Sequence, residues 1–402
     1  MERKITDEIF KIGVYDNKID LFEGHYQVPN GVTYNSYLLK GEKNIVIDAV
    51  EKDFVDEWLN NIKEILDDNG VDYLIVQHME PDHSAGVEKF LEQYPNAKVV
   101  GNMMTFNMLE QYFPNKNFND NKILINNNDE LKIGQRELKF VFVPMVHWPE
   151  VFVTYDKNSK TIFSADAFGR FGKDDNSLWE DEARRYYFGI VGKYGMQVQK
   201  ALEKLSSLEI ARICPLHGPI LENKLSEYIN KYDLWSKYLP EKKGVTIAFT
   251  SVYGHTKQAV EILSEELKNH NIECETFDLC RCEKSYALAS AFKYSNLVLA
   301  TTTYNMDIFP DMRDFVESLS LRNFQNRNIA IIENGTWAPN AKNIIIPLLK
   351  NSNIISEKNI TIKSNLSSVN LQEIKNLAFD IKNQLNWFIL CIELTSHNSI
   401  IT

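Results

Sequence analysis

Residues 77 to 86 read Gln77-His78-Met79-Glu80-Pro81-Asp82-His83-Ser84-Ala85-Gly86, and they decide how the first half of the chain is interpreted. The apolar run 73–76 before them predicts a buried strand, so four side chains able to bind metal lie on the loop that leaves this strand. A lone histidine beside an apolar run is usually a satisfied packing residue, and Asp-His pairs are common in turns. Two imidazoles and two carboxylates in one short loop have no packing reason, and together they predict a metal site.

Further candidate ligands follow other predicted strands in the first half of the chain. Strands predicted at 137–143 and 161–164 lead to His147 and Asp166, and a short apolar run leads to His217. A sheet edge gathers side chains from strand ends that are distant in sequence, so we expect these residues to meet the loop quoted above. The predicted ligand set is His78, Glu80 and His147 for one ion, Asp82, His83 and His217 for a second ion, and Asp166 as the bridge.

The residues around this loop predict a mixed α/β domain. Strands at 32–39 and 44–48 form a hairpin through the turn at 40–43, and apolar spacing predicts helices at 53–67 and 84–94. The alternation of three ligands in the loop predicts an extended backbone that points them to one side. Further strands are predicted at 97–100 and 151–155.

The second half of the chain has a different pattern. Residues 234–244 carry Pro, Gly and terminal charges and lack periodicity, which predicts a domain boundary. Strands then alternate with helices, of which 256–269 is the clearest, and this alternation predicts a doubly wound parallel sheet. The predicted strands are 245–249, 272–277, 296–300, 328–332 and 359–362. We therefore predict domains at 1–243 and 244–385, and the tail 386–402 is left unassigned.

Three loops of the second half follow predicted strands and suit a phosphate and an aromatic ring. The first loop enters a helix, whose N-terminus offers free N–H groups and a favourable dipole to an anion. It lacks the Gly-Lys-Ser/Thr ending of a nucleoside triphosphate site, so a monophosphate is favoured. Aromatic residues of the other loops can cover an isoalloxazine ring, which predicts FMN. The candidate FMN residues are Ser251, Val252, Tyr253, Gly254, His255, Thr256, Thr302, Thr303, Tyr304, Asn305, Asn334, Gly335, Thr336 and Trp337.

Composition limits the class of protein. The chain has 402 residues, which favours two domains, and its formal net charge of −11 argues against a nucleic-acid partner. We see no N-terminal signal and no apolar run long enough to span a bilayer, so we expect no membrane partner and a cytoplasmic location. Five cysteines without C-x-x-C spacing suit a reducing compartment, and Cys280-Arg281-Cys282 is a poor metal site because no further ligands lie nearby in sequence.

The first half resembles the metallo-β-lactamase superfamily, whose loop commonly reads His-x-His-x-Asp-His. Glu80 departs from that pattern, because it stands where the second histidine is expected. A carboxylate at this place makes a harder, more anionic site, which shifts the expectation from zinc toward redox-active iron, although zinc also accepts carboxylates. The second half resembles flavodoxin, whose ligand is FMN.

Together the two halves resemble the flavodiiron proteins, also called A-type flavoproteins, over residues 1 to about 385. The motifs that carry the resemblance are 78–83, 147–150, 164–169, 215–218 and 251–256. The resemblance implies an αββα metallo-β-lactamase-like domain with a non-haem diiron centre, followed by a flavodoxin-like FMN domain. It gives the two irons the ligand set stated above, and family members differ in whether the residue at His83 contacts metal. It also points to Tyr187, in an aromatic pair, as a candidate donor near the centre.

The activity implied by the resemblance is reduction of dioxygen to water, of nitric oxide to nitrous oxide, or both. Two irons and a two-electron flavin store the four electrons that dioxygen requires. A fused rubredoxin would show two Cys pairs, so the expected donor is a separate rubredoxin-like protein. A head-to-tail homodimer or a homotetramer would bring the FMN of one subunit near the irons of another. The alternatives are a zinc-dependent lactamase-type hydrolase fused to a flavodoxin module and a non-catalytic FMN electron carrier.

Overall fold

The chain forms two compact units, which are described separately. In the computed structural model the described residues are 3–67, 69–173, 179–349 and 354–397, with side chains omitted at 354–357 and 386–397. The units comprise Met1–Lys237 and Tyr238–Thr402. This division falls inside the segment 234–244, and the domain bounds given from the sequence stay predictions.

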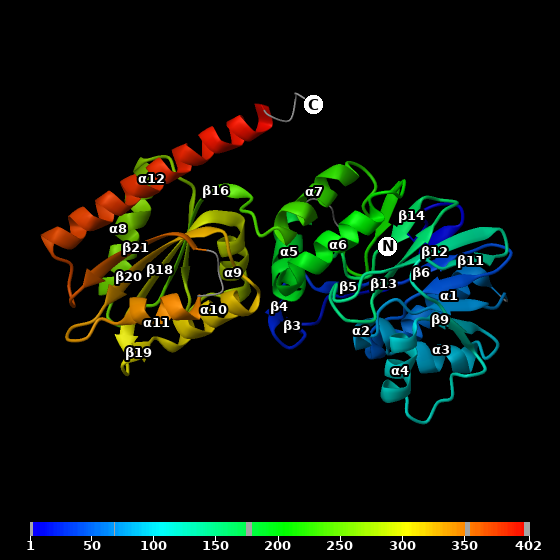
Figure 1. Ribbon diagram of the computed structural model, residues 1–402. Helices are drawn as coiled ribbons and strands as arrows, with labels where there is room; N and C mark the ends of the chain where they lie inside the picture. Colours follow the sequence, from blue (N-terminus) through cyan, green and yellow to red (C-terminus); the bar gives the residue numbers. More distant parts are fainter. Residues whose placement is uncertain (1–2, 68, 174–178, 350–353, 398–402) are drawn as a thin grey trace. The chain divides into compact units, whose positions relative to one another are not determined.

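One sheet of the first unit is built by the N-terminal part of the chain (Figure 1). Its order is β1-β6-β7-β8-β9-β10, and its strands from β7 onward run parallel. Strands β6 and β7 pair antiparallel, which confirms the predicted hairpin. The strands are β1 (Ile9–Lys11), β6 (Tyr37–Leu39), β7 (Ile45–Ile47), β8 (Tyr73–Ile75), β9 (Lys98–Gly101) and β10 (Lys122–Leu124).

The single strand predicted at 32–39 is wrong, because the chain bends at Asn35. The backbone N–H of Asn35 donates to the carbonyl of Leu216 at 2.7 Å, so this residue is tied to a distant loop instead of to the sheet. The first part, β5 (Val32–Tyr34), pairs with β2 (Val14–Asp16) in a small separate sheet. Another short pair, β3 (Leu21–Phe22) and β4 (Tyr26–Gln27), forms a hairpin.

The second sheet of this unit has the order β11-β12-β13-β14-β15. Strands β14 and β15 are parallel, and the other neighbours are antiparallel, so β12, β14 and β15 all end at the same edge. The strands are β11 (Glu130–Ile133), β12 (Arg136–Phe142), β13 (Phe152–Asp156), β14 (Thr161–Phe163) and β15 (Arg212–Cys214).

The two sheets pack face to face between outer helices, an αββα sandwich as predicted. Apolar side chains of both sheets, among them Ile75 and Phe140, form the cluster between them. Trp58, Phe90 and Phe106 pack helices onto the outer face of the first sheet. The helices on that side are α1 (Val55–Leu66), α3 (Val87–Gln93) and α4 (Met103–Tyr112). Those on the other side are α6 (Gly195–Leu205) and α7 (Leu225–Ser236).

The loop after β8 is extended only as far as Glu80. Pro81 begins a short helix, α2 (Pro81–Ser84), because its fixed φ suits the first helical position. The extended geometry predicted from alternation is therefore wrong for Asp82, which belongs to this helical turn.

The second unit is a parallel sheet with helices on both faces (Figure 1). Its order, β17-β16-β18-β20-β21, corresponds to 2-1-3-4-5 in chain order, which is the flavodoxin-like order, and the prediction is confirmed. The short strand β19 (Asp307–Ile308) pairs with β18 at the margin. The main strands are β16 (Lys242–Phe249), β17 (Cys274–Asp278), β18 (Tyr294–Tyr304), β20 (Arg327–Asn334) and β21 (Ile354–Ile362).

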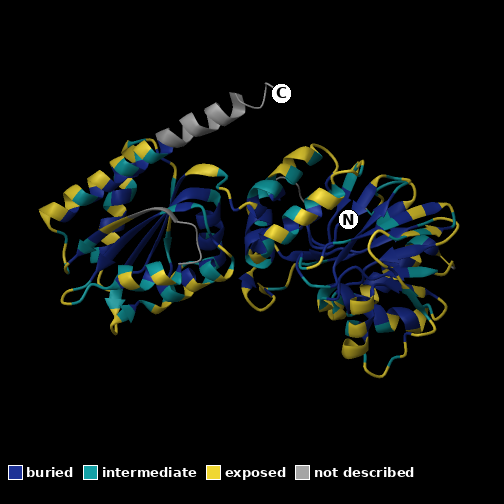
Figure 2. Ribbon diagram, in the orientation of Figure 1, coloured by how far each residue is buried: buried dark blue, intermediate teal, exposed yellow. Residues whose placement is uncertain are grey.

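Continuous apolar runs place the central strands of this sheet in the interior, which Figure 2 shows as dark blue strands between helices with exposed outer faces. The helices α8 and α12 cover one face through residues such as Leu263 and Leu377. The helices α9, α10 and α11 lie on the other face (Figure 1). These helices are α8 (His255–Asn269), α9 (Lys284–Lys293), α10 (Pro310–Leu321), α11 (Ala341–Leu348) and α12 (Ser368–His397).

The segment 386–402, which the sequence left unassigned, begins within α12. Its side chains, including Cys391, lie outside the described residues. Among the residues that were searched, no helix is both long and apolar enough to cross a membrane.

Candidate functional site

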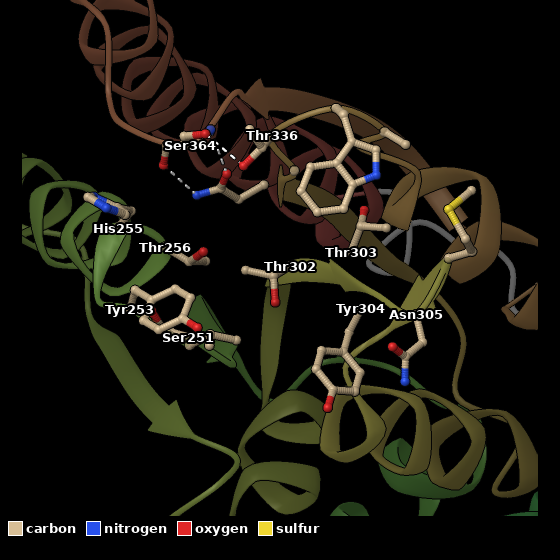
Figure 3. Close-up of a pocket in the computed structure, with 16 residues that line it drawn as sticks. Ser251, Tyr253, His255, Thr256, Thr302, Thr303, Tyr304, Asn305, Thr336 and Ser364 are labelled. Carbon is tan, nitrogen blue, oxygen red and sulfur yellow. Dashed lines mark hydrogen bonds between the residues drawn. The ribbon is translucent and has the colours of Figure 1, made fainter.

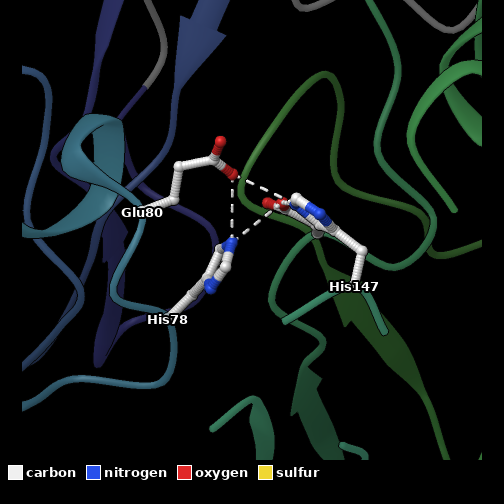
Figure 4. Close-up of side chains that lie close together, drawn as sticks. His78, Glu80 and His147 are labelled. Atoms are coloured by element: carbon white, nitrogen blue, oxygen red, sulfur yellow. Dashed lines mark hydrogen bonds and ion pairs between the residues drawn. The ribbon is translucent and has the colours of Figure 1, made fainter. Parts of the chain in front are cut away.

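Carboxyl ends of strands from both sheets of the first unit bring the predicted ligands together. The first ligand group is His78, Glu80 and His147 (Figure 4). Oε2 of Glu80 lies 3.2 Å from Nε2 of His78 and 3.1 Å from Nε2 of His147. All three side chains are buried or nearly so, with His78 fully enclosed. The loop after β8 and the loop after β12 therefore meet at one point.

The second ligand group is Asp82, His83 and His217. Nε2 of His83 lies 3.0 Å from Nε2 of His217 and 3.2 Å from Oδ2 of Asp82. Nε2 of His83 thus faces the other two ligands of this group. Two atoms that each lie roughly 2.1 Å from one ion are about 3.0 Å apart at a right angle, so these spacings suit side chains that share a cation.

Asp166 lies between the two groups. Its Oδ2 is 3.0 Å from Nε2 of His147 and 3.4 Å from Nε2 of His78. Its Oδ1 is 3.3 Å from Nε2 of His83 and 3.7 Å from Nε2 of His217. One oxygen thus faces each ligand group, which is the geometry of a carboxylate that bridges two ions.

The charges of this cluster show that it suits cations. Burial opposes charge on the histidines, yet the carboxylates outweigh it and raise the pKa of His83 to about 10 and that of His147 to about 9. The pKa of Glu80 is lowered to about 2, because hydrogen bonds from the histidines outweigh the opposing effect of burial. Both oxygens of Asp82 and Oδ1 of Asp166 are buried without a hydrogen-bond partner among the described residues. Positive charge supplied by metal ions would satisfy these atoms.

Backbone and side-chain groups form hydrogen bonds with the ligands on the side away from the metal positions. Nδ1 of His78 lies 2.9 Å from Oε1 of Glu150, and Nδ1 of His217 lies 2.7 Å from the carbonyl oxygen of Thr33. Asp48 accepts hydrogen bonds from the backbone N–H groups of residues 77 and 78. Burial raises the pKa of Asp48 to about 6. These contacts fix the orientation of the ligands.

Glu23 is a further carboxylate at this centre that the sequence did not indicate. It lies on the exposed turn between β3 and β4 with a φ of 50°. Partial burial of its carboxyl group, together with the charge of Glu80, raises the pKa of Glu23 to about 7. The sequence Phe22-Glu23-Gly24 carries no ligand spacing, and only the folded chain shows that this turn approaches the centre.

Of the aromatic pair, Tyr186 faces the metal centre more directly than the predicted Tyr187. The ring of Tyr186 lies 5.4 Å from that of His217, whereas the ring of Tyr187 lies 5.1 Å from Tyr232. Burial and the charge of Asp166 hold the pKa of Tyr186 well above its ordinary value. Tyr186 ends α5 (Trp179–Tyr186), and a π-helical turn begins at Tyr187, which alters the direction of the second tyrosine.

A cavity of about 710 Å³ lies at the carboxyl edge of the sheet in the second unit (Figure 3). Every predicted FMN residue except Gly254 lines it, and Gly254 caps the N-terminus of α8 with a φ of 94°. The hydroxyls of Thr256 and Thr302 are buried without a partner among the described residues. Its volume lies within the range of small-molecule and cofactor sites.

A fourth loop, after β21, also reaches this cavity. Ser364 of that loop donates its backbone N–H to Oδ1 of Asn334 at 3.1 Å, and its hydroxyl donates to Thr336 at 2.8 Å (Figure 3). Met306 and Ala338 line the cavity as well. The signal available in sequence was the predicted strand 359–362, since the loop after it shares the edge with the other three.

Comparisons with known proteins agree with this arrangement. Residues 32–218 match the model of the family described as ODP family beta lactamase. The chain is 30% identical over 362 residues to the flavo-diiron protein FprA2 of Clostridium acetobutylicum, covering 86% of this chain and 90% of that protein. It is 28% identical over 373 residues to the nitric oxide reductase of Moorella thermoacetica, covering 89% and 92%. Its fold is similar to rubredoxin oxygen:oxidoreductase from Desulfovibrio gigas, with a TM-score of 0.89, 23% identity and coverage of 96% and 99%.

Proposed function

The chain belongs to the flavodiiron proteins, oxidoreductases with FMN and a non-haem diiron centre, and we propose that it reduces dioxygen, nitric oxide or both. The products are water and nitrous oxide (O₂ + 4 H⁺ + 4 e⁻ → 2 H₂O; 2 NO + 2 H⁺ + 2 e⁻ → N₂O + H₂O). Electrons come from a rubredoxin-like donor and pass through FMN. The observation that carries this proposal is Asp166, which presents one oxygen to each of two ligand groups.

The residues of the centre fit two irons. The first ligand group would hold one iron, the second would hold the other, and Asp166 would join them. Three carboxylates make the site anionic and hard, which favours iron in its higher oxidation state over a soft metal. When bound, the iron pair would supply reducing electrons directly to the gas. The protein's part is to fix the ligands, exclude bulk water and keep protons available at the edge of the centre, where Glu23 lies.

The cavity of the second unit fits FMN. Its phosphate would meet the N-terminus of α8, where Ser251 already accepts hydrogen bonds from the backbone N–H groups of Gly254 and Lys257. The hydroxyls of Thr256 and Thr302 offer further partners. The side chain of Trp337 lines the cavity and is 87% exposed, so it is free to lie against a flavin ring.

Exposed aromatic side chains support a homodimer or homotetramer in which subunits meet head to tail. Tyr253 and Trp337 are exposed at the cavity of the second unit. In the first unit, Tyr112 is exposed and interacts electrostatically with Glu80 of the metal centre. Large apolar side chains left in water at both sites are typical of surfaces that bind protein.

A reducing compartment such as the cytoplasm is part of the same proposal. The four cysteines with described side chains, Cys214, Cys274, Cys280 and Cys282, are free thiols. Thiols in this state are typical of proteins kept under reducing conditions.

The proposal is tested by metal analysis, flavin extraction and anaerobic gas uptake with reduced rubredoxin. We expect two irons and one FMN per chain, and consumption of at least one gas. Asp166→Ala should abolish uptake, whereas the control Asp156→Asn, which removes a carboxylate bonded to Arg136 away from the centre, should retain it. Stoichiometric zinc with hydrolase activity would instead establish the lactamase-type alternative, and full gas uptake by Asp166→Ala would exclude the diiron centre as the catalyst.

A further inference from the structure

The two ligand groups differ in the hydrogen-bond partners of the histidine Nδ1 atoms, which face away from the metal positions. Nδ1 of His78 meets a carboxylate oxygen, that of Glu150, at 2.9 Å. Nδ1 of His217 meets a backbone carbonyl, that of Thr33, at 2.7 Å. Nδ1 of His83 has no hydrogen-bond partner in the part of the chain that the structure describes. The first ligand group therefore has an anionic partner behind an imidazole, and these contacts give the second group a neutral one.

Glu150 is held firmly in this position. Its side chain is buried, and the oxygen that meets His78 also accepts the backbone N–H of Met79 at 2.8 Å. The side chain of Asn102 donates to the carbonyl of Glu150 at 2.6 Å. Asn102 is itself the N-cap of α4, where it accepts the backbone N–H of Thr105. Both the carboxylate and its backbone are thus fixed by neighbouring elements.

A carboxylate at Nδ1 has two effects on the imidazole. It fixes the proton on Nδ1 and leaves the lone pair on Nε2, the atom that faces Glu80 and Asp166. It also forms a hydrogen bond about twice as strong as one to a neutral acceptor. The ring becomes a better electron donor, and a better donor stabilises ferric iron more than ferrous iron.

We propose that Glu150 is a positioning residue that acts through His78 and makes the two metal positions inequivalent. Iron at the first ligand group binds more tightly and is harder to reduce than iron at the second. This inference rests on the proposed function, because it requires iron at both positions.

The test compares Glu150→Gln and Glu150→Leu in the full chain, reconstituted with Mössbauer-active iron. Glutamine keeps an oxygen that can accept from Nδ1–H of His78 and loses only the charge, whereas leucine removes the partner altogether. Asp156→Asn is the matched control, since it neutralises a buried carboxylate that is bonded to Arg136 and does not contact the ligands. The readouts are the spectrum of each iron, its midpoint potential (Fe³⁺ + e⁻ → Fe²⁺) and its affinity in competition with a chelator.

We expect two distinct iron signals in the wild-type protein and in the control. In Glu150→Gln, the ferrous-to-ferric ratio of one iron at a fixed potential should rise about tenfold, equivalent to about 59 mV for a one-electron couple. The other iron should be unchanged. In Glu150→Leu, one iron should bind about 10- to 100-fold more weakly.

The outcomes separate this inference from the proposed function. If wild-type protein holds two irons and consumes gas while Glu150→Gln shifts neither iron, or shifts both equally, the role of Glu150 is overturned and the reductase proposal stands. If wild-type protein does not hold two irons, both proposals are overturned.

Discussion

Iron binding near neutral pH should displace about three protons from the metal-free protein. The three carboxylates of the predicted ligand set have lowered pKa values, and three of its histidines have raised ones, in each case against the effect of burial. These groups are Glu80, Asp82 and Asp166 on the acidic side, and His78, His83 and His147 on the basic side. Three negative carboxylates therefore face three protonated imidazoles when no metal is bound. Iron takes the place of those protons, because a ligand nitrogen must be deprotonated to bind it.

The proton count is measured by calorimetric titration of ferrous iron into chelator-treated protein, without oxygen, in two buffers with different ionisation enthalpies. The difference in observed heat divided by the difference in ionisation enthalpy gives the number of protons. The count should fall above pH 9, because His147 loses its proton with a pKa of about 9 even without metal. His270→Gln, which changes a histidine of the second unit, should leave the count unchanged.

The reasoning fails if the observed heats are the same in both buffers near neutral pH. Equal heats would mean that no protons leave, so the histidines would already be neutral in the metal-free protein. The carboxylates would then have to be balanced in some other way, and the electrostatic account of the cluster would be wrong.

Three further predictions concern stability and flavin binding. The unfolding free energy of the metal-free protein, measured with urea, should be greatest between about pH 4.5 and 6.5. The stability that the raised pKa of His83 contributes is complete below pH 6.5 and is lost as pH rises through about 10. The stability that the lowered pKa of Glu80 contributes is complete above pH 4.5 and is lost as pH falls through about 2. A midpoint independent of pH would contradict both shifts. Gly254→Ala should weaken FMN binding about tenfold in a fluorescence titration, because the backbone φ of 94° at this position costs an alanine roughly 1–2 kcal/mol. The control Gly24→Ala, which also lies at a positive φ, should leave FMN affinity unaltered. Arg327→Met should lower the unfolding free energy of the second unit by about 3 kcal/mol, because this buried guanidinium donates to backbone carbonyls that would lose their partner. An unchanged melting temperature would show that those carbonyls find other donors.

Local spacing was enough to predict which side chains gather at the metal centre. His78, Glu80 and His83 lie in one loop, and the distant ligands each follow a predicted strand, so strand ends at a common edge bring them together. Their role as metal ligands stays a proposal. Glu150 could not be recognised as the partner of His78, because the two are separated by 72 residues and no periodic pattern connects them.

Backbone geometry limited the remaining predictions. The alternation of residues 78, 80 and 82 indicated an extended loop, but Pro81 begins a helical turn that includes Asp82. The choice between Tyr186 and Tyr187 depended on a π-helical turn that has no signature in the sequence. The fourth loop of the flavin cavity, with Ser364, required knowledge of the strand order, which alternation of strands and helices does not determine.

Gln77 joins the two sheets of the first unit beside the metal centre. Its side-chain N–H donates to Asp48 at 2.9 Å at the edge of the first sheet, and its side-chain oxygen accepts the backbone N–H of Thr154 in the second sheet at 2.8 Å. One buried side chain thereby fixes the two sheets relative to each other directly beside His78. Because the ligands come from both sheets, this link sets their spacing before iron arrives, and little of the binding free energy is spent on ordering them. The first unit therefore differs from small zinc domains that fold only with metal, and removal of iron should leave its αββα sandwich intact.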